Sequence, residues 1–275
     1  MEAETNRLVI MATEDETLVV NKYHSRTLFD YVDEYCFDEW ACRGHCINVE
    51  DFTGALDFDE LQRTATYDTD ALLTLVELIY NFWILSHKKF SDNEKGHTLN
   101  WCGNYYHLKN VMDDVLGQYN HTAFVDEDKD CVLVVEDKAE ITAVAEIMPT
   151  YELAFDVIKY NHRSLKGQIE LKKKILLALG AELEPKRKQL RSLNSKLEDD
   201  IFYMLNNLNI RHNNRSKTDK NYKEYVAKMR KDRLEKWYDE LYQMSLLAFL
   251  LLDNSKRAED IKELRTKING GQTNG

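Results

Sequence analysis

The stretch Leu190–Asp219, LRSLNSKLEDDIFYMLNNLNIRHNNRSKTD, decides how the C-terminal half of the chain folds. Its apolar residues recur at intervals of three and four, which places them along one stripe of a helix. These residues are Leu190, Leu193, Leu197, Ile201, Met204, Leu205 and Leu208. The pattern stops at the polar segment 211–215 (RHNNR), and asparagine suits a helix C-terminus because it tolerates a left-handed backbone. We therefore predict one amphipathic helix that delivers an arginine and a histidine to its C-terminal end.

The composition predicts a folded, helix-rich protein. The chain has 275 residues, of which 43% are apolar and 11% aromatic, and it has only two prolines and ten glycines. So few turn residues favour long helices over a turn-rich β fold. We find no run of 18 apolar residues, so we expect no membrane span. The acidic N-terminus does not resemble a signal peptide, and five cysteines, an odd number, favour reduced thiols and a cytoplasmic protein.

Charge is distributed unevenly along the chain. Between Lys159 and Lys236 there are 21 Lys and Arg against 10 Asp and Glu, whereas residues 1–158 hold 11 against 32. Two interpretations are open. The basic segment can face an anion such as RNA, or the acidic and basic segments can be solvated helix faces that complement each other.

Apolar periodicity predicts a mainly α fold with one small β element. Helices are predicted at 28–40, 71–85, 101–116, 139–147, 150–160, 164–179 and 234–251, with Gly180 as the C-cap of the sixth. Segments 121–125 and 131–135 flank an acidic turn and predict a β-hairpin. Residues 7–20 contain two short apolar runs that periodicity does not assign. We expect an acidic helical region with this hairpin over 1–149 and a helical bundle over 150–275, with a soft boundary near 136–150.

Two other clusters contain residue types that can bind metal ions. Cys36, Cys42, His45 and Cys46 lack the usual spacing of a zinc site, and Cys102 with His107 would complete one only through tertiary structure. The acidic turn 126–130 lacks the glycine and terminal glutamate of a calcium loop. We therefore predict buried thiols and a solvated turn, with neither a metal nor a cofactor.

Arg211 and His212 form the candidate site. An arginine offers two parallel donors to phosphate oxygens, and an imidazole can move a proton during attack by an RNA 2′-hydroxyl. In the alternative interpretation the asparagines end the helix and the basic residues offset the negative end of its dipole. Adjacent helical residues point about 100° apart, so convergence of both groups on one atom would need a second copy of the chain in a two-fold dimer.

The order of NNLNIRHNN (206–214), YKEYVAKM (222–229) and LEKWYDELYQMSLLAFLLLD (234–253) resembles the C-terminal part of bacterial HEPN proteins. The resemblance covers roughly residues 151–264. HEPN domains are helical bundles, often found in toxin and abortive-infection (phage-defence) systems. Active members are metal-independent ribonucleases with an arginine, a polar residue and, several positions later, a histidine. Arg211 and the residue after it match the first part, whereas no histidine occurs from Asn213 to Gly275.

The resemblance implies a phage-defence protein whose bundle binds RNA and, in an active member, cleaves it without metal. Arg211 and His212 would then be catalytic. The RNA-binding residues would be Asn213, Asn214, Arg215, Lys217 and Lys220. The competing hypothesis is a non-catalytic protein-interaction or dimerisation module in which the RHNN motif is a structural helix cap. The missing downstream histidine favours the module, and the basic segment favours RNA; a protein partner or a homodimer is expected in both.

Overall fold

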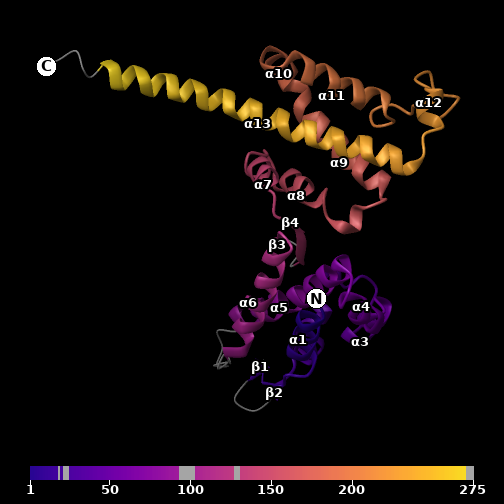
Figure 1. Ribbon diagram of the computed structural model, residues 1–275, viewed down its shortest axis with the longest axis vertical. Coiled ribbons are helices and arrows are strands. Elements are labelled where there is room, and N and C mark those ends of the chain that lie inside the picture. Colours follow the sequence, from indigo (N-terminus) through magenta and orange to yellow (C-terminus); the bar gives the residue numbers. More distant parts are fainter. Residues whose placement is uncertain (18, 21–24, 93–102, 127–130, 271–275) are drawn as a thin grey trace. The chain divides into compact units, whose positions relative to one another are not determined.

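The computed structural model describes residues 1–17, 19–20, 25–92, 103–126 and 131–270 and is mainly α-helical, which confirms the predicted fold class (Figure 1). The chain folds as two units, Met1–Asp137 and Lys138–Gly275. This boundary lies within the soft boundary expected near residues 136–150, at its N-terminal end rather than at residue 149. The reason is that helix α7 (Ala139–Glu146) packs on α8 (Tyr151–Lys159) and on the C-terminal helix α13 (Lys231–Gly270).

Unit 1 is built around helix α5 (Thr69–Asp92), which contains the predicted helix at 71–85. Leu72, Val76, Ile79 and Phe82 are fully buried on it. The segment Thr69–Lys89 is long and apolar enough to cross a membrane by length and composition, but 67% of its most apolar stretch is buried inside the structure. The position of α5 at the centre of a core therefore accounts for its apolar composition.

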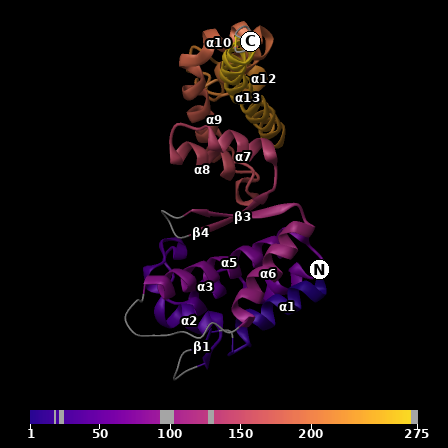
Figure 2. The same ribbon diagram turned by 90° about the vertical axis from the view of Figure 1, so that its left-hand side faces the viewer.

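Short helices surround α5 in unit 1 (Figure 2). They are α1 (Glu2–Thr13), α2 (Leu28–Tyr35), α3 (Val49–Ala55), α4 (Phe58–Ala65) and α6 (Gly103–Gln118), with 3₁₀ turns at Phe37–Glu39 and Ala41–Arg43. The first apolar run of the unassigned segment 7–20 is helical, because Thr5, Leu8 and Ala12 recur at helical spacing and are buried. The second run includes β1 (Val19–Val20), which pairs with β2 (Ser25–Arg26).

The predicted β-hairpin is confirmed. Strands β3 (His121–Asp126) and β4 (Cys131–Glu136) pair antiparallel, with Ala123 opposite Val134. Side chains of α5 bind backbone amides on the edge of β4 that does not pair with β3. Asn81 Oδ1 accepts from the Val132 amide at 2.8 Å, and Glu77 Oε2 accepts from the Val134 amide at 2.7 Å. Turn residues 127–130 lie outside the described residues. The hairpin is therefore held on the helical core, which a two-stranded sheet needs for stability.

Unit 2 is a helical bundle in which α13 contacts most of the other helices. Its remaining elements are α9 (Ile169–Leu183), α10 (Arg187–Leu193), α11 (Ser195–Asn207) and α12 (Glu224–Ala227), with 3₁₀ turns at Arg163–Leu165 and Glu184–Lys186. The core face of α13 includes Leu234, Tyr238, Leu241 and Tyr242, all fully buried. The long hydrophobic helix predicted from residue 234 is thus confirmed, and it continues to Gly270.

The prediction of one continuous helix through Leu190–Leu208 is wrong. The chain turns at Asn194, whose backbone is extended and whose side chain accepts a hydrogen bond from the Leu197 amide at 3.0 Å. An asparagine cap of this kind satisfies an amide at the start of a new helix. As a result, Leu193 is 44% exposed, although it falls on the apolar stripe.

The prediction of Gly180 as a helix C-cap is also wrong, because α9 continues past it to Leu183. A Cβ atom at Gly180 would lie 2.9 Å from the side chain of Leu205 on α11. The glycine therefore permits close approach of two helices rather than a left-handed turn.

Candidate functional site

The loop that follows α11 is shaped by two asparagines. Asn209 adopts a left-handed backbone with φ of 61°, so the residue that ends the helix lies before the RHNN motif rather than within it. Asn214 is fully buried; its Oδ1 accepts from the Asn209 amide at 2.7 Å, and its Nδ2 donates to the Asn221 carbonyl at 2.8 Å. Asn214 thus joins the two ends of the loop and has a structural role.

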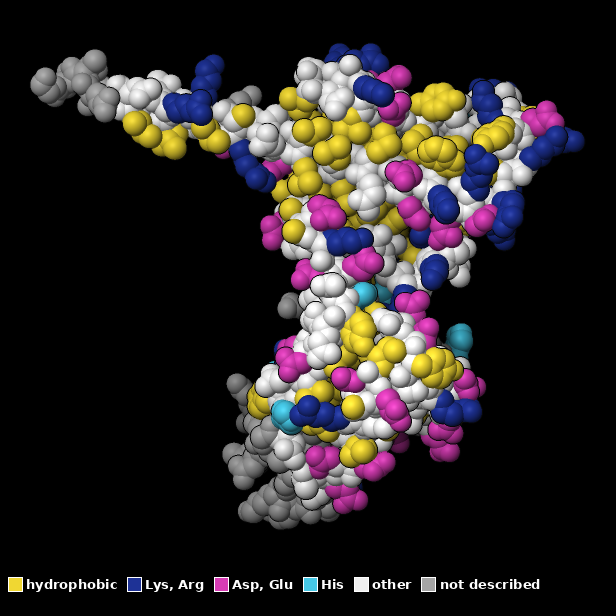
Figure 3. Space-filling view, in the orientation of Figure 1, with side chains coloured by type: hydrophobic (Ala, Val, Ile, Leu, Met, Phe, Trp, Pro, Cys, Tyr) yellow, Lys and Arg dark blue, Asp and Glu magenta, His cyan; other side chains and the backbone are white. Residues whose placement is uncertain are grey.

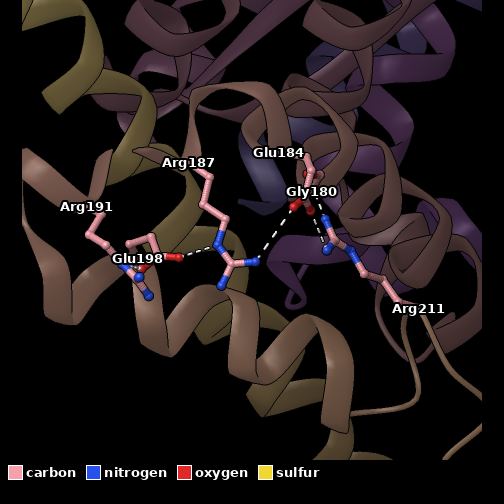
Figure 4. A network of polar contacts seen from close by, with 6 residues as sticks. All are labelled: Gly180, Glu184, Arg187, Arg191, Glu198 and Arg211. Atoms are coloured by element: carbon pink, nitrogen blue, oxygen red, sulfur yellow. Dashed lines mark hydrogen bonds and ion pairs between the residues drawn. The ribbon is translucent and has the colours of Figure 1, made fainter. Parts of the chain in front are cut away.

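Arg211 points back into unit 2, toward α9 (Figure 4). Its Nη1 lies 2.6 Å from Glu184 Oε2, and its Nη2 donates to the Gly180 carbonyl at 3.0 Å. The guanidinium carbon lies 5.2 Å from the centre of the Phe202 ring, and the side chain is only 21% exposed. The planar fork of the arginine therefore already holds a carboxylate and a carbonyl of the same chain.

A second carboxylate, Glu198, lies between two further arginines (Figure 4). Arg187 Nε donates to one oxygen of Glu198, and Arg191 Nε donates to the other at 2.6 Å. The Glu198 side chain is fully buried. Its burial opposes the charged form, but the hydrogen bonds and positive charges of Arg187 and Arg191 outweigh this effect and lower the pKa of the carboxyl.

Arg187 connects these two groups into one network. Its Nη1 lies 3.7 Å from Glu184 Oε1, and its guanidinium carbon lies 4.2 Å from the centre of the Phe202 ring. The network contains three guanidinium groups and two carboxylates, so most of its positive charge is neutralised internally. It holds α9, α10, α11 and the following loop in one arrangement.

The remaining predicted site residues lie on the loop after α11. Arg215 is half-buried, and its Nη2 contacts the carbonyls of Ala227 and Met229 at 3.4 and 3.3 Å. Asn213 is exposed, and its side chain accepts from the Ser216 amide at 3.2 Å. These contacts serve the local fold of the loop.

His212, Lys217 and Lys220 are exposed on this loop, and no side-chain hydrogen bond or ion pair joins any of them to another described residue. Arg211 is turned inward, so the structure does not direct the predicted catalytic pair to a common point. Within one copy, proton transfer by His212 therefore has no positioned arginine beside it.

A partly buried ion cluster that the sequence did not predict lies between α9 and α13. Lys172 Nζ lies 2.8 Å from both Glu235 Oε1 and Asp239 Oδ1, and 5.2 Å from the centre of the Tyr160 ring. Tyr160 stacks on Tyr242 with ring centres 4.0 Å apart. Burial acts against the charge of Glu235, but Lys172 and the Gly167 amide outweigh it and lower the pKa of this carboxyl. The cluster clamps two core helices.

The spacing of the network residues does not locate the network in the sequence. On one continuous helix Glu198, seven residues after Arg191, would lie about 10 Å further along the axis and out of reach. The turn at Asn194 is what brings Glu198 to the two arginines. No sequence signal connects Glu184 with Arg211, because that contact depends on how α9 and the loop meet.

The described residues contain no group of three or more His, Cys, Asp or Glu side chains arranged to hold a metal ion. Cys36 is buried, whereas Cys42 is exposed, so the predicted burial of both thiols is wrong for Cys42. Cys102, considered above as a further ligand, lies outside the described residues.

Comparisons with known proteins identify no relative: no family model, no curated protein and no solved structure matches this chain. The interpretation of the site therefore depends on its own geometry.

Proposed function

We infer that unit 2 is a non-catalytic protein-assembly module in which the RHNN motif is a structural device. The observation that carries this inference is the contact of Arg211 with Glu184 at 2.6 Å, together with its hydrogen bond to the Gly180 carbonyl. Asn214 and Arg215 are likewise engaged with backbone groups of the same loop region. With Asn213, which accepts from the Ser216 amide, four of the five residues of segment 211–215 make contacts that stabilise the fold.

Recruitment of Arg211 to an RNA phosphate would require these contacts to break. Hydrogen bonds to charged groups contribute about 1.5–3 kcal/mol each, and the 46% exposure of Glu184 places its pair toward or below the lower end of that range. A phosphate would also have to reach a side chain that is only 21% exposed. The geometry therefore favours an arginine that supports the loop over one that grips an outside anion.

The surface of unit 2 supports an assembly role. Several large apolar side chains are substantially exposed on its helices. They are Leu171, Leu177, Leu193, Tyr203, Trp237 and Leu247, each 41–65% exposed. Figure 3 shows apolar side chains gathered along the face of unit 2 that carries α13. Exposed apolar side chains that gather on one face are typical of a protein-interaction site.

RNA binding by the loop is the second candidate function. It is favoured by the exposure of His212, Lys217 and Lys220 on one loop and by the basic excess of residues 159–236. In this proposal the lysines contact phosphates, and a second copy supplies what one copy lacks for cleavage. A role in phage defence, implied by the resemblance to HEPN proteins, is compatible with either function.

One experiment separates the two candidates. Wild type, Arg211→Ala and His212→Ala are incubated with single-stranded RNA in the presence of EDTA, and the thermal unfolding of each is measured. The assembly role predicts intact RNA in all three samples, with a lower Tm for Arg211→Ala alone. Cleavage by wild type that His212→Ala abolishes at an unchanged Tm would contradict it.

A binding measurement completes the comparison. Salt-dependent RNA binding that is lost in Lys217→Ala/Lys220→Ala, but kept in the surface control Lys267→Ala, would support the second candidate. Binding that no loop substitution changes would count against it.

A further inference from the structure

The last part of α13 extends past the other helices of unit 2 (Figure 1). Every described side chain from Lys256 to Asn269 is exposed. Among them, Ile261, Leu264 and Ile268 are 49%, 55% and 59% exposed. Figure 3 shows apolar side chains along one side of this projecting segment. Because short isolated helices are marginal in water, an apolar face on such a segment indicates a missing partner.

The spacing of these residues is that of a coiled coil. Intervals of three and four place them at positions a, d and a of a heptad repeat. Toward the bundle, the preceding a and d positions are Leu247, Leu250, Asn254 and Arg257. Leu247 is 48% exposed and Leu250 is partly exposed, so the face continues onto the bundle. It spans three heptads, or about 32 Å of helix.

We propose that this face pairs with the same face of a second copy of the chain as a parallel, in-register coiled coil. The inference rests on the proposed assembly role of unit 2 and names its partner. In that arrangement a g position meets the e position of the next heptad on the partner helix. Asp260 occupies g and Arg265 occupies e, so two-fold symmetry creates two reciprocal pairs of opposite charge.

The two polar core positions fit the same arrangement. Asn254 is at an a position, where a single asparagine specifies register and oligomeric state at some cost in stability. Arg257, at d, forms an ion pair with Asp253 of its own helix, which offsets the charge that it brings to the seam. These polar residues therefore favour pairing with a second copy of the same helix over pairing with an unrelated apolar partner.

The first test compares two aspartate substitutions on opposite faces of the projecting segment. Ile261→Asp places a charge in the seam, whereas Thr266→Asp places the same charge on the outward face, where Thr266 is exposed. Sedimentation equilibrium of the full-length protein should give a dimer for wild type and Thr266→Asp. Ile261→Asp should weaken association by about 100-fold or more, because the new charge would be buried without a partner.

The second test exchanges charges to establish orientation. Asp260→Arg and Arg265→Asp should each weaken the dimer, and the double variant should restore it, because the reciprocal pairs reappear with their signs reversed. An antiparallel dimer does not bring these two positions together in this way. Failure of the double variant to restore association would overturn the parallel arrangement.

Two results would overturn the proposal as a whole. One is a wild-type protein that stays monomeric at about 100 μM, a concentration at which a weak dimer with micromolar Kd is formed. The other is a dimer that persists in Ile261→Asp. That result would place self-association on another surface, and it would not contradict the assembly role of unit 2. Conversely, RNA cleavage that depends on His212 would remove the proposed function without affecting the coiled coil.

Discussion

Replacement of Glu198 by glutamine tests whether the arginine network stabilises unit 2. The substitution keeps the shape of the side chain and removes the charge that two arginines share. Each charge-assisted hydrogen bond contributes about 1.5–3 kcal/mol. Arg187 and Arg191 are 39% and 59% exposed, so water partly solvates them once the carboxylate is gone. Glutamine also retains one acceptor oxygen. We therefore expect a loss of about 2–3 kcal/mol in unfolding free energy.

For a unit of this size the loss corresponds to a fall in Tm of about 6–12 °C. Amide hydrogen exchange read by mass spectrometry should localise the change to α10 and α11. The matched control is Glu224→Gln, which removes a carboxylate that is 68% exposed and paired with Lys228. That change should cost less than about 0.5 kcal/mol. If Glu198→Gln and the control destabilise equally, the network does not stabilise the fold as described.

The effect of Glu198→Gln on stability should depend on pH. The pKa of Glu198 is lowered in the folded state, so its contribution to stability is complete above the unfolded-state value of about 4.3 and is lost as pH falls through the folded-state pKa. The stability difference between wild type and Glu198→Gln should therefore be constant from about pH 5 to 7 and shrink below that range. A difference that grows on acidification would refute the assignment.

Three further substitutions test other contacts, each followed by urea unfolding. Lys172→Met should cost about 2–3 kcal/mol, because Glu235, which is only 16% exposed, loses its partner. Adding Glu235→Gln should recover part of that loss, and a strictly additive double variant would refute the ion cluster. Gly180→Ala should destabilise the protein by about 1–2 kcal/mol, because the new methyl group would overpack against Leu205. The control Gly54→Ala, whose methyl group would meet nothing within 4 Å, should stabilise by up to about 1 kcal/mol. Equal effects of the two substitutions would contradict the close approach of α9 and α11 at Gly180. Asn214→Asp should cost about 2–3 kcal/mol, because a carboxylate cannot donate a hydrogen bond to the Asn221 carbonyl. An unchanged stability would contradict the structural role of the Asn214 side chain.

Regular elements were predictable from the sequence where one periodicity acts over a long segment. Helix α5 and the long helix α13 each present an apolar face at helical spacing, and the hairpin consists of two short apolar segments that flank an acidic turn in the sequence. These patterns depend only on local geometry. The short first apolar run within α1 was not assignable, since few apolar residues mark its buried face.

The breaks and contacts that build the site were not predictable, because each depends on a tertiary partner. Asn194 interrupts a stripe that continues across it, and the turn brings Glu198 back to Arg187. Gly180 is ambiguous in a sequence, since a glycine near a helix end fits a C-cap as well as a close approach. The inward direction of Arg211 follows from contacts with another helix, which no local pattern encodes.

The most direct test of the structural role of Arg211 is a double-mutant cycle with Glu184. Arg211→Gln, Glu184→Gln and the double variant are compared with wild type by urea unfolding. We predict a coupling energy of about 0.5–1 kcal/mol, since Glu184 is 46% exposed and its pair with Arg211 is partly screened. No coupling, with Arg211→Gln as stable as wild type but unable to bind RNA that wild type binds, would instead identify an arginine kept for an outside anion.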